Sequence, residues 1–132
     1  MEKTVLSFGF KPERNNTLYS LLSKDGYVLR ICDNLKDMDN QISAVSPLLV
    51  LADLSGMSMD DAIRVVSGFR RLTLIPLVTI TDISAGIPTI LWRGADVCLS
   101  SDIDDARLVS TVKAQIRRNT EYAKMDRLVK KA

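Results

Sequence analysis

The sequence predicts an α/β sandwich, a parallel sheet with helices packed on both faces. Short apolar runs alternate with segments of helical periodicity along the chain, and this rhythm indicates parallel strands joined by right-handed crossovers. The run 48–54 is apolar on both of its faces, as expected of a central strand covered from both sides. With 132 residues, 46% of them hydrophobic, the chain suits a single core.

Five apolar runs rich in Val, Ile and Leu are expected to form the strands. They are residues 4–8, 27–32, 48–54, 77–81 and 97–100. The first two helices are expected over residues 13–23 and 35–44. Ser58 is expected to cap a third helix that runs to about residue 70, because Asp61 stands three residues later in a capping-box pattern. Pro88 and Gly94 bound a short fourth helix.

The long final helix is expected to be capped by Ser101 or Asp102. The carboxylates of Asp102, Asp104 and Asp105 are interpreted as first-turn groups that oppose the helix macrodipole, not as metal ligands. The predicted inward face of this helix holds Ile103, Ala106, Val109, Val112 and Ile116.

The composition excludes several classes of function. The chain has no histidine, which removes imidazole-activated nucleophiles, histidine-ligated zinc and phosphohistidine carriage by this chain. The net charge of +2 is too small to indicate a nucleic-acid or membrane partner by itself. Cys32 and Cys98 make neither a metal-ligand spacing nor a disulfide-rich framework. Unpaired cysteines and the lack of a signal-peptide or membrane-span pattern indicate a cytoplasmic protein.

Asp53 is the most unusual residue of the predicted sheet. It closes an apolar strand at the carboxyl edge, where doubly wound folds place their sites. An ionised carboxylate is costly there unless a cation or hydrogen bonds hold it. Its predicted partners are either backbone N–H groups or the ammonium of Lys11, on the loop after the first strand.

Three stretches near strand ends carry a family resemblance: LLVLADLSGMSMDDA around Asp53, IPLVTIT ending in Thr81, and RGADVCLSS before the last helix. In order and spacing, over about residues 3–118, they resemble the CheY-like receiver domains of two-component response regulators. The resemblance implies a flavodoxin-like three-layer sandwich with a five-stranded parallel sheet, strand order 2-1-3-4-5, and five helices. It also implies that Asp53 would accept a phosphoryl group from a kinase's histidine with the help of Mg²⁺.

The sequence departs from the family at the positions of the metal-binding carboxylates and of the lysine that neutralises the phosphoryl group. Gly9 and Phe10 stand at the positions of the two carboxylates that complete the metal site, or Phe8 and Gly9 if the alignment shifts by one residue. Ser101 stands at the position of the lysine. Cys98 replaces the aromatic residue that moves in the switch, while Thr81 is kept. The chain is therefore interpreted as a degenerate receiver of the pseudo-receiver type, with no metal, no other cofactor and no enzymatic activity.

Residues 1–118 are predicted to form the receiver-like domain, and residues 119–132 a basic helical tail or connector. Leu91 and Trp92 on the fourth helix are candidate interface residues, because Trp92 is predicted to face outward or along a seam. The alternative is that Trp92 folds back over the sheet edge. The apolar residues of the tail lie on roughly the opposite side of the final helix from its core face, at ~100° per residue. They are Tyr122, Met125, Leu128 and Val129.

The leading hypothesis is a phosphorylation-independent signalling module. It would contact a protein partner, an output domain or a second copy through its last two βα units and tail. The alternative is a phosphoacceptor that uses Asp53 with atypical ligands. A nucleotide-binding enzyme is disfavoured because the first turn, GFKPERNN, is not a glycine-rich phosphate loop. A charge run on a helix is usually a solvated face, which argues against a nucleic-acid contact by the tail.

Overall fold

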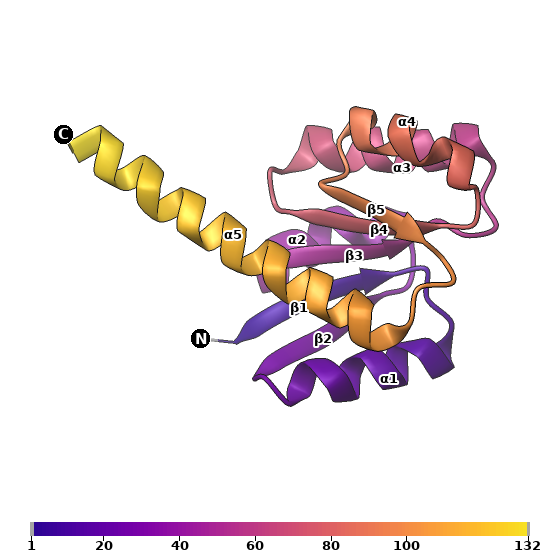
Figure 1. Ribbon diagram of the computed structural model, residues 1–132, viewed down its shortest axis with the longest axis horizontal. Coiled ribbons are helices and arrows are strands. Elements are labelled where there is room, and N and C mark those ends of the chain that lie inside the picture. Colours follow the sequence, from indigo (N-terminus) through magenta and orange to yellow (C-terminus); the bar gives the residue numbers. More distant parts are fainter. Residues whose placement is uncertain (1, 132) are drawn as a thin grey trace.

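Within residues 2–131, five parallel strands form one sheet in the order β2-β1-β3-β4-β5, which confirms the predicted flavodoxin-like fold (Figure 1). The computed structural model describes the backbone of residues 2–131 and the side chains of residues 2–128. Because every pairing is parallel, the carboxyl ends of all the strands lie at one edge. The strands are β1 (Lys3–Phe8), β2 (Tyr27–Cys32), β3 (Leu49–Asp53), β4 (Leu77–Thr81) and β5 (Val97–Ser100).

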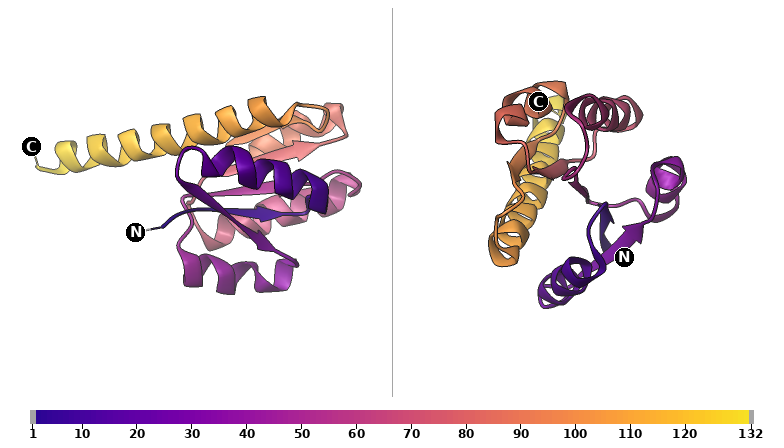
Figure 2. Two further views of the ribbon diagram at one scale, coloured as in Figure 1. Left: turned by 90° about the horizontal axis from the view of Figure 1, so that it is seen from below. Right: turned by 90° about the vertical axis from the view of Figure 1, so that its right-hand side faces the viewer.

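The α-helices of the described chain divide between the two faces of the sheet. They are α1 (Pro12–Ser23), α2 (Met38–Val45), α3 (Met59–Leu72), α4 (Ile87–Arg93) and α5 (Asp105–Lys131). Figure 2 shows α1 and α5 on one face, with α2, α3 and α4 on the other. Each face has its own apolar core, one around Leu18 and Val112 and one around Val66 and Phe69. None of the helices within residues 2–131 combines the length and apolar composition needed to cross a lipid bilayer.

Most predicted boundaries agree with the structure within two residues. The Ser58 cap is confirmed, because its hydroxyl accepts a hydrogen bond from the Asp61 N–H at 3.1 Å. Gly94 ends α4 with a φ of +133°. Cys32 and Cys98 are buried free thiols on β2 and β5, at opposite edges of the sheet.

The second helix begins later than the sequence predicts. Residues 35–37 form a 3₁₀ turn in place of a first α-helical turn. The Asn34 side chain closes this turn by accepting a hydrogen bond from the Asp37 N–H at 3.0 Å. An asparagine that bonds its own backbone competes with the helix in this way. The expected helix over residues 35–44 is therefore corrected to a turn followed by α2.

The final helix also begins later than predicted. The Asp104 carboxylate accepts a hydrogen bond from the Arg107 N–H at 2.8 Å, so Asp104 is the cap, and neither Ser101 nor Asp102 fills that position. The buried face differs as well, because Ala106 is exposed. The buried residues of the helix are Leu108, Val109, Val112 and Ile116.

The second half of α5 leaves the body of the molecule as one continuous helix. Figure 1 shows its yellow end projecting beyond the sheet, on the side where β1 begins. All side chains over residues 117–128 are exposed. The tail therefore adds nothing to either core.

Candidate functional site at the carboxyl edge of the sheet

The sheet brings four of the predicted site residues to one edge. Asp53 is the last residue of β3 and Thr81 the last of β4, while Gly9 and Ser101 directly follow β1 and β5. A hydrogen bond of 2.9 Å from the Ser101 N–H to the Thr81 carbonyl extends the pairing of β4 and β5. This edge is the candidate site.

Asp53 is half-buried and bonded to its own loop. Its Oδ1 accepts a hydrogen bond from the Ser55 N–H at 2.8 Å, in an Asx-type turn that opens the β3–α3 loop. Lys11 occupies the exposed N-cap position of α1. None of the ion pairs between side chains of residues 2–128 joins Lys11 to Asp53. A backbone N–H, not an ammonium, is therefore the partner of this carboxylate.

Gly9 makes a close backbone contact with Asp53. Its φ is +87°, a region that side chains disfavour. A Cβ atom on Gly9 would lie 2.5 Å from the Asp53 carbonyl oxygen. No carboxylate fits here unless the backbone moves, so the first of the two metal-ligand positions implied by the resemblance cannot carry a side chain in this conformation.

Phe10, at the second of those positions, contributes its ring to the core. The ring is buried with Leu18 and Leu108 beneath α1 and α5. The Arg14 guanidinium lies over the ring, 5.9 Å from its centroid. Phe10 therefore has a packing role that accounts for its side chain.

Arg14 ties the first turns of α1 to the β5–α5 loop, a role with no counterpart in the predicted site. Its Nε donates to Asp105 Oδ1 at 2.7 Å, its Nη1 to the Ser101 carbonyl at 3.1 Å, and its Nη2 to the Ile103 carbonyl at 2.7 Å. Hydrogen bonds from a charged donor are the stronger kind. The sequence offers no local signal for this contact, because Arg14 looks like any exposed residue of an amphipathic helix.

Backbone N–H groups also fix the loops around Asp53. The Thr81 hydroxyl is buried and accepts a hydrogen bond from the Ile83 N–H at 3.1 Å. The Asp82 carboxylate accepts one from the Gly56 N–H at 3.3 Å, which links the β4–α4 and β3–α3 loops. Ser55 Oγ is buried with no hydrogen-bond partner among the described residues.

Among the predicted site residues at this edge, only Asp53 carries a carboxylate, and Asp82 follows Thr81 directly. Mg²⁺ requires near-octahedral coordination by oxygen ligands. Within the described part of the chain, no group of three acidic or thiol side chains is arranged to hold a metal. The position of the family's lysine is Ser101, whose carbonyl accepts from Arg14.

The two thiols are poor nucleophiles. Burial raises the pKa of both Cys32 and Cys98 above the ordinary value for a thiol. Both therefore stay protonated at neutral pH, and they pack as small apolar side chains.

The predicted interface residues are exposed at two places. On α4, the side chains of Trp92 and Leu91 are 87% and 41% exposed, and on the tail those of Tyr122 and Met125 are 71% and 60% exposed. Val129 lies outside the residues whose side chains are described. The apolar stripe of the tail is thus uncovered in the single chain.

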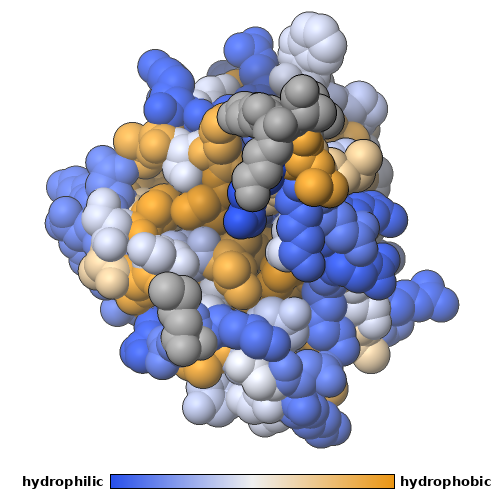
Figure 3. Space-filling view, turned by 90° about the vertical axis from the view of Figure 1, so that its left-hand side faces the viewer, coloured by the Kyte–Doolittle hydropathy of each residue, from blue (hydrophilic) through white to orange (hydrophobic). Residues whose placement is uncertain are grey.

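Apolar surface also surrounds the base of the projecting helix, where α5 leaves the body of the molecule. Figure 3 views this end and shows hydrophobic residues gathered around it. A hollow of about 420 Å³ there is lined in part by Tyr27, Leu48 and Ile116, with Lys3 and Arg117 at its border. Apolar and basic groups therefore lie next to each other where α5 leaves the body.

Comparison with known proteins gives no match to a family model and none to a curated protein. Solved structures do match. Two crystal structures of NtrX from Brucella abortus have TM-scores of 0.79 and 0.81 and 17% identity, covering 97% of this chain but only 29% and 30% of the NtrX chains. A two-component response regulator from Clostridium difficile has a TM-score of 0.75 and 22% identity, covering 89% of this chain and 98% of its own.

A further match is an atypical orphan response regulator described as having a phosphorylation-independent regulatory mechanism. Its TM-score is 0.71 and its identity 19%, covering 86% of this chain and 95% of its own. These likenesses show that the chain has the fold of response regulator receiver domains. The chain spans less than a third of the NtrX chains that it matches.

Proposed function

We propose that this chain is a phosphorylation-independent signalling module of the pseudo-receiver type, cytoplasmic, without enzymatic activity, and active through protein contacts. The observation that carries the proposal is the packing around Asp53. Gly9 abuts its carbonyl, Phe10 is buried in the core, and Arg14 is bonded to the loop at Ser101. At these positions a phosphoacceptor needs metal-binding carboxylates and a lysine, whereas in this chain the residues make packing and loop contacts.

The chemistry of phosphoryl transfer supports this proposal. The reaction depends on positioning and on charges that stabilise the transferring oxygens, with little covalent work for the protein. The receiver resemblance assigns those charges to a divalent cation and a lysine. Gly9 and Phe10 stand where the resemblance places the two further carboxylates, and no ion pair among residues 2–128 joins Asp53 to Lys11. Arg14 engages Asp105 and two carbonyls with its three nitrogens.

The exposed apolar residues support a role in protein contact. Trp92 on α4 and Tyr122 and Met125 on α5 are of the types that anchor interfaces. Two partners fit: an output domain reached along α5, or a second copy that pairs with the tail to form a dimer. The longer NtrX chains favour the first, and the apolar stripe of α5 serves either.

Intact mass measurement tests the proposal. The chain is incubated with acetyl phosphate and Mg²⁺ beside its Asp53→Asn variant, and a competent receiver domain run in parallel shows that the donor is active. We expect no added phosphate on either form of this chain. One added phosphate on the wild type and none on Asp53→Asn would favour the alternative, a phosphoacceptor with atypical ligands.

A further inference from the structure

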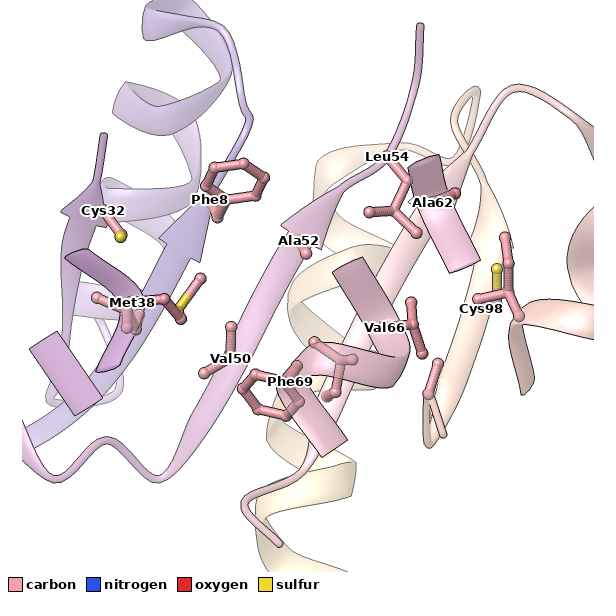
Figure 4. Close-up of a cluster of buried hydrophobic side chains, with 14 residues drawn as sticks. Phe8, Cys32, Met38, Val50, Ala52, Leu54, Ala62, Val66, Phe69 and Cys98 are labelled. Atoms are coloured by element: carbon pink, nitrogen blue, oxygen red, sulfur yellow. The ribbon is translucent and has the colours of Figure 1, made fainter. Parts of the chain in front are cut away.

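A cavity of about 230 Å³ lies between the sheet and the helices α2 and α3, and none of the predicted site residues at the carboxyl edge lines it. Figure 4 shows Met38 and Phe69 on either side of Val50, which belongs to the sheet. All three residues line the cavity, and Leu35 and Leu72, both partly exposed, lie at its border. An apolar hollow therefore opens between the two helices.

The lining gives water few partners. Most of its residues are apolar, and the hydroxyl of Thr79, one of the polar ones, already donates to the Val97 carbonyl at 3.0 Å. An engineered apolar cavity of about 150 Å³ stays dry and binds benzene. The larger cavity here has room for an apolar group somewhat bigger than benzene.

Gly68 contributes no side chain at the border of this space. It lies in the interior of α3 and lines the cavity, although glycine weakens a helix relative to alanine. A Cβ atom at this position would meet no other atom within 4 Å. Close packing does not require a glycine here, so its effect is to leave room.

One charge stands at the cavity. Among the described residues that line it, Arg64 alone is charged. Its side chain is 81% exposed, and its ion pair with Asp61 is long, at 3.7 Å. The guanidinium is therefore able to turn toward an anionic group held at the opening.

We propose that this cavity binds a small amphipathic organic anion, with its apolar body between α2 and α3 and its carboxylate at Arg64. The apolar lining selects the body, and the single positive charge selects the sign of the head group. The site is separate from Asp53, so the proposal stands whether or not that residue accepts phosphate.

Calorimetric titration of the full chain with octanoate tests the proposal, with 1-octanol and octylamine as matched ligands of the same length. We expect saturable binding in the order octanoate, octanol, octylamine. Arg64→Gln should weaken octanoate about threefold and leave octanol unchanged. Arg71→Gln, which changes an exposed cation of α3 outside the cavity, should alter neither.

Filling the space should abolish the site. Gly68→Leu is expected to weaken both octanoate and octanol by about tenfold or more, and Gly68→Ala to have a smaller effect in the same direction. Amide chemical shifts of the wild type with octanoate give a readout that needs no variant, and the shifts should centre on Met38 and Phe69. No saturable binding, equal binding of octylamine, or shifts centred elsewhere would overturn the proposal.

Discussion

Arg14 and Gly9 act on the candidate site through the backbone. Arg14 holds two carbonyls of the β5–α5 loop, and Gly9 lets β1 end against the Asp53 carbonyl. Neither contact involves the Asp53 carboxylate, whose Oδ1 bonds to the Ser55 N–H. At this scale the site is a set of packed loops around an acidic side chain.

Replacing Arg14 should destabilise the fold. Arg14→Ala removes three charge-assisted hydrogen bonds from a mostly buried side chain, and we expect a loss of about 2 kcal/mol in the free energy of unfolding. Arg14→Lys should restore only part of the lost stability, because lysine lacks the planar guanidinium group that donates several hydrogen bonds at once. Urea unfolding measures the free energy of unfolding of both variants. Arg71→Ala, at an exposed position, is the control, and its free energy of unfolding should lie within about 0.5 kcal/mol of the wild type. Equal effects of Arg14→Ala and Arg71→Ala would rule out the loop-holding role.

Two glycines with similar positive φ angles isolate the close contact at Gly9. Gly26 has a φ of +82° and open space around it, whereas a Cβ on Gly9 meets the Asp53 carbonyl. We expect Gly26→Ala to cost about 1 kcal/mol from backbone strain alone. Gly9→Ala should cost about 1 to 3 kcal/mol more, because the added atom overpacks the contact. Chemical unfolding of both variants measures the two losses in the free energy of unfolding. Similar losses would show that the contact between Gly9 and the Asp53 carbonyl is not tight.

The sequence predicted the acidic and hydroxyl residues of the site but not the residue that organises their surroundings. Asp53 and Thr81 were found because they end apolar strands, and parallel strand ends share an edge. Arg14 carries no such signal, because its acceptors lie far along the chain and only the folded protein brings them close. The ion pair between Lys11 and Asp53, one of the two alternatives, is not among the ion pairs of residues 2–128. The carboxylate bonds to the Ser55 N–H of its own loop, a contact that sequence spacing alone does not separate from a lysine partner.

At the scale of elements, the helix starts show how tertiary contacts override local patterns. Three aspartates stand near the start of α5, at positions 102, 104 and 105. Aspartate is a good N-cap residue, so each of them could cap the helix. Arg14 binds the carbonyls of Ser101 and Ile103, which keeps these residues out of the helix. Asp104 therefore becomes the cap. For α3, the local pattern at Ser58 sufficed, because nothing distant competes for it.

Removing the two caps should cost similar amounts of stability. Ser58→Ala and Asp104→Ala each leave a helix N–H without its side-chain acceptor, and we expect each to lose about 1 kcal/mol. Ser20→Ala, an exposed position in the interior of α1, should be neutral or slightly stabilising because alanine favours helix. Thermal unfolding compares the three. If Asp104→Ala behaves like Ser20→Ala, α5 does not depend on that cap.

At the scale of the whole molecule, a receiver-like body carries a projecting helix with an uncovered apolar stripe. The fold class followed from the alternation of strands and helices, which leaves few topologies, and the strand order followed from the resemblance to receiver domains. The tail was also predicted to be helical, as α5 is, but its apolar residues turn away from the core and give no packing reason for the helix to persist. A partner for those residues would supply that reason.

In the isolated chain a second copy is the available partner, so we expect a mass in solution near twice the 14.7 kDa of one chain. Light scattering after size-exclusion chromatography measures it. The double variant Tyr122→Glu and Met125→Glu should shift the chain to the monomer without loss of stability, because both side chains are exposed. Asn119→Glu, an exposed change on the same helix, should leave the mass unchanged. A wild type that stays monomeric at high concentration would leave an output domain as the partner.

The most direct test of phosphorylation independence is a calorimetric titration of the full chain with beryllofluoride, a phosphoryl mimic, in the presence of Mg²⁺. The proposed function predicts no saturable heat, with identical traces for the wild type and Asp53→Asn. Saturable binding by the wild type that Asp53→Asn abolishes would contradict it.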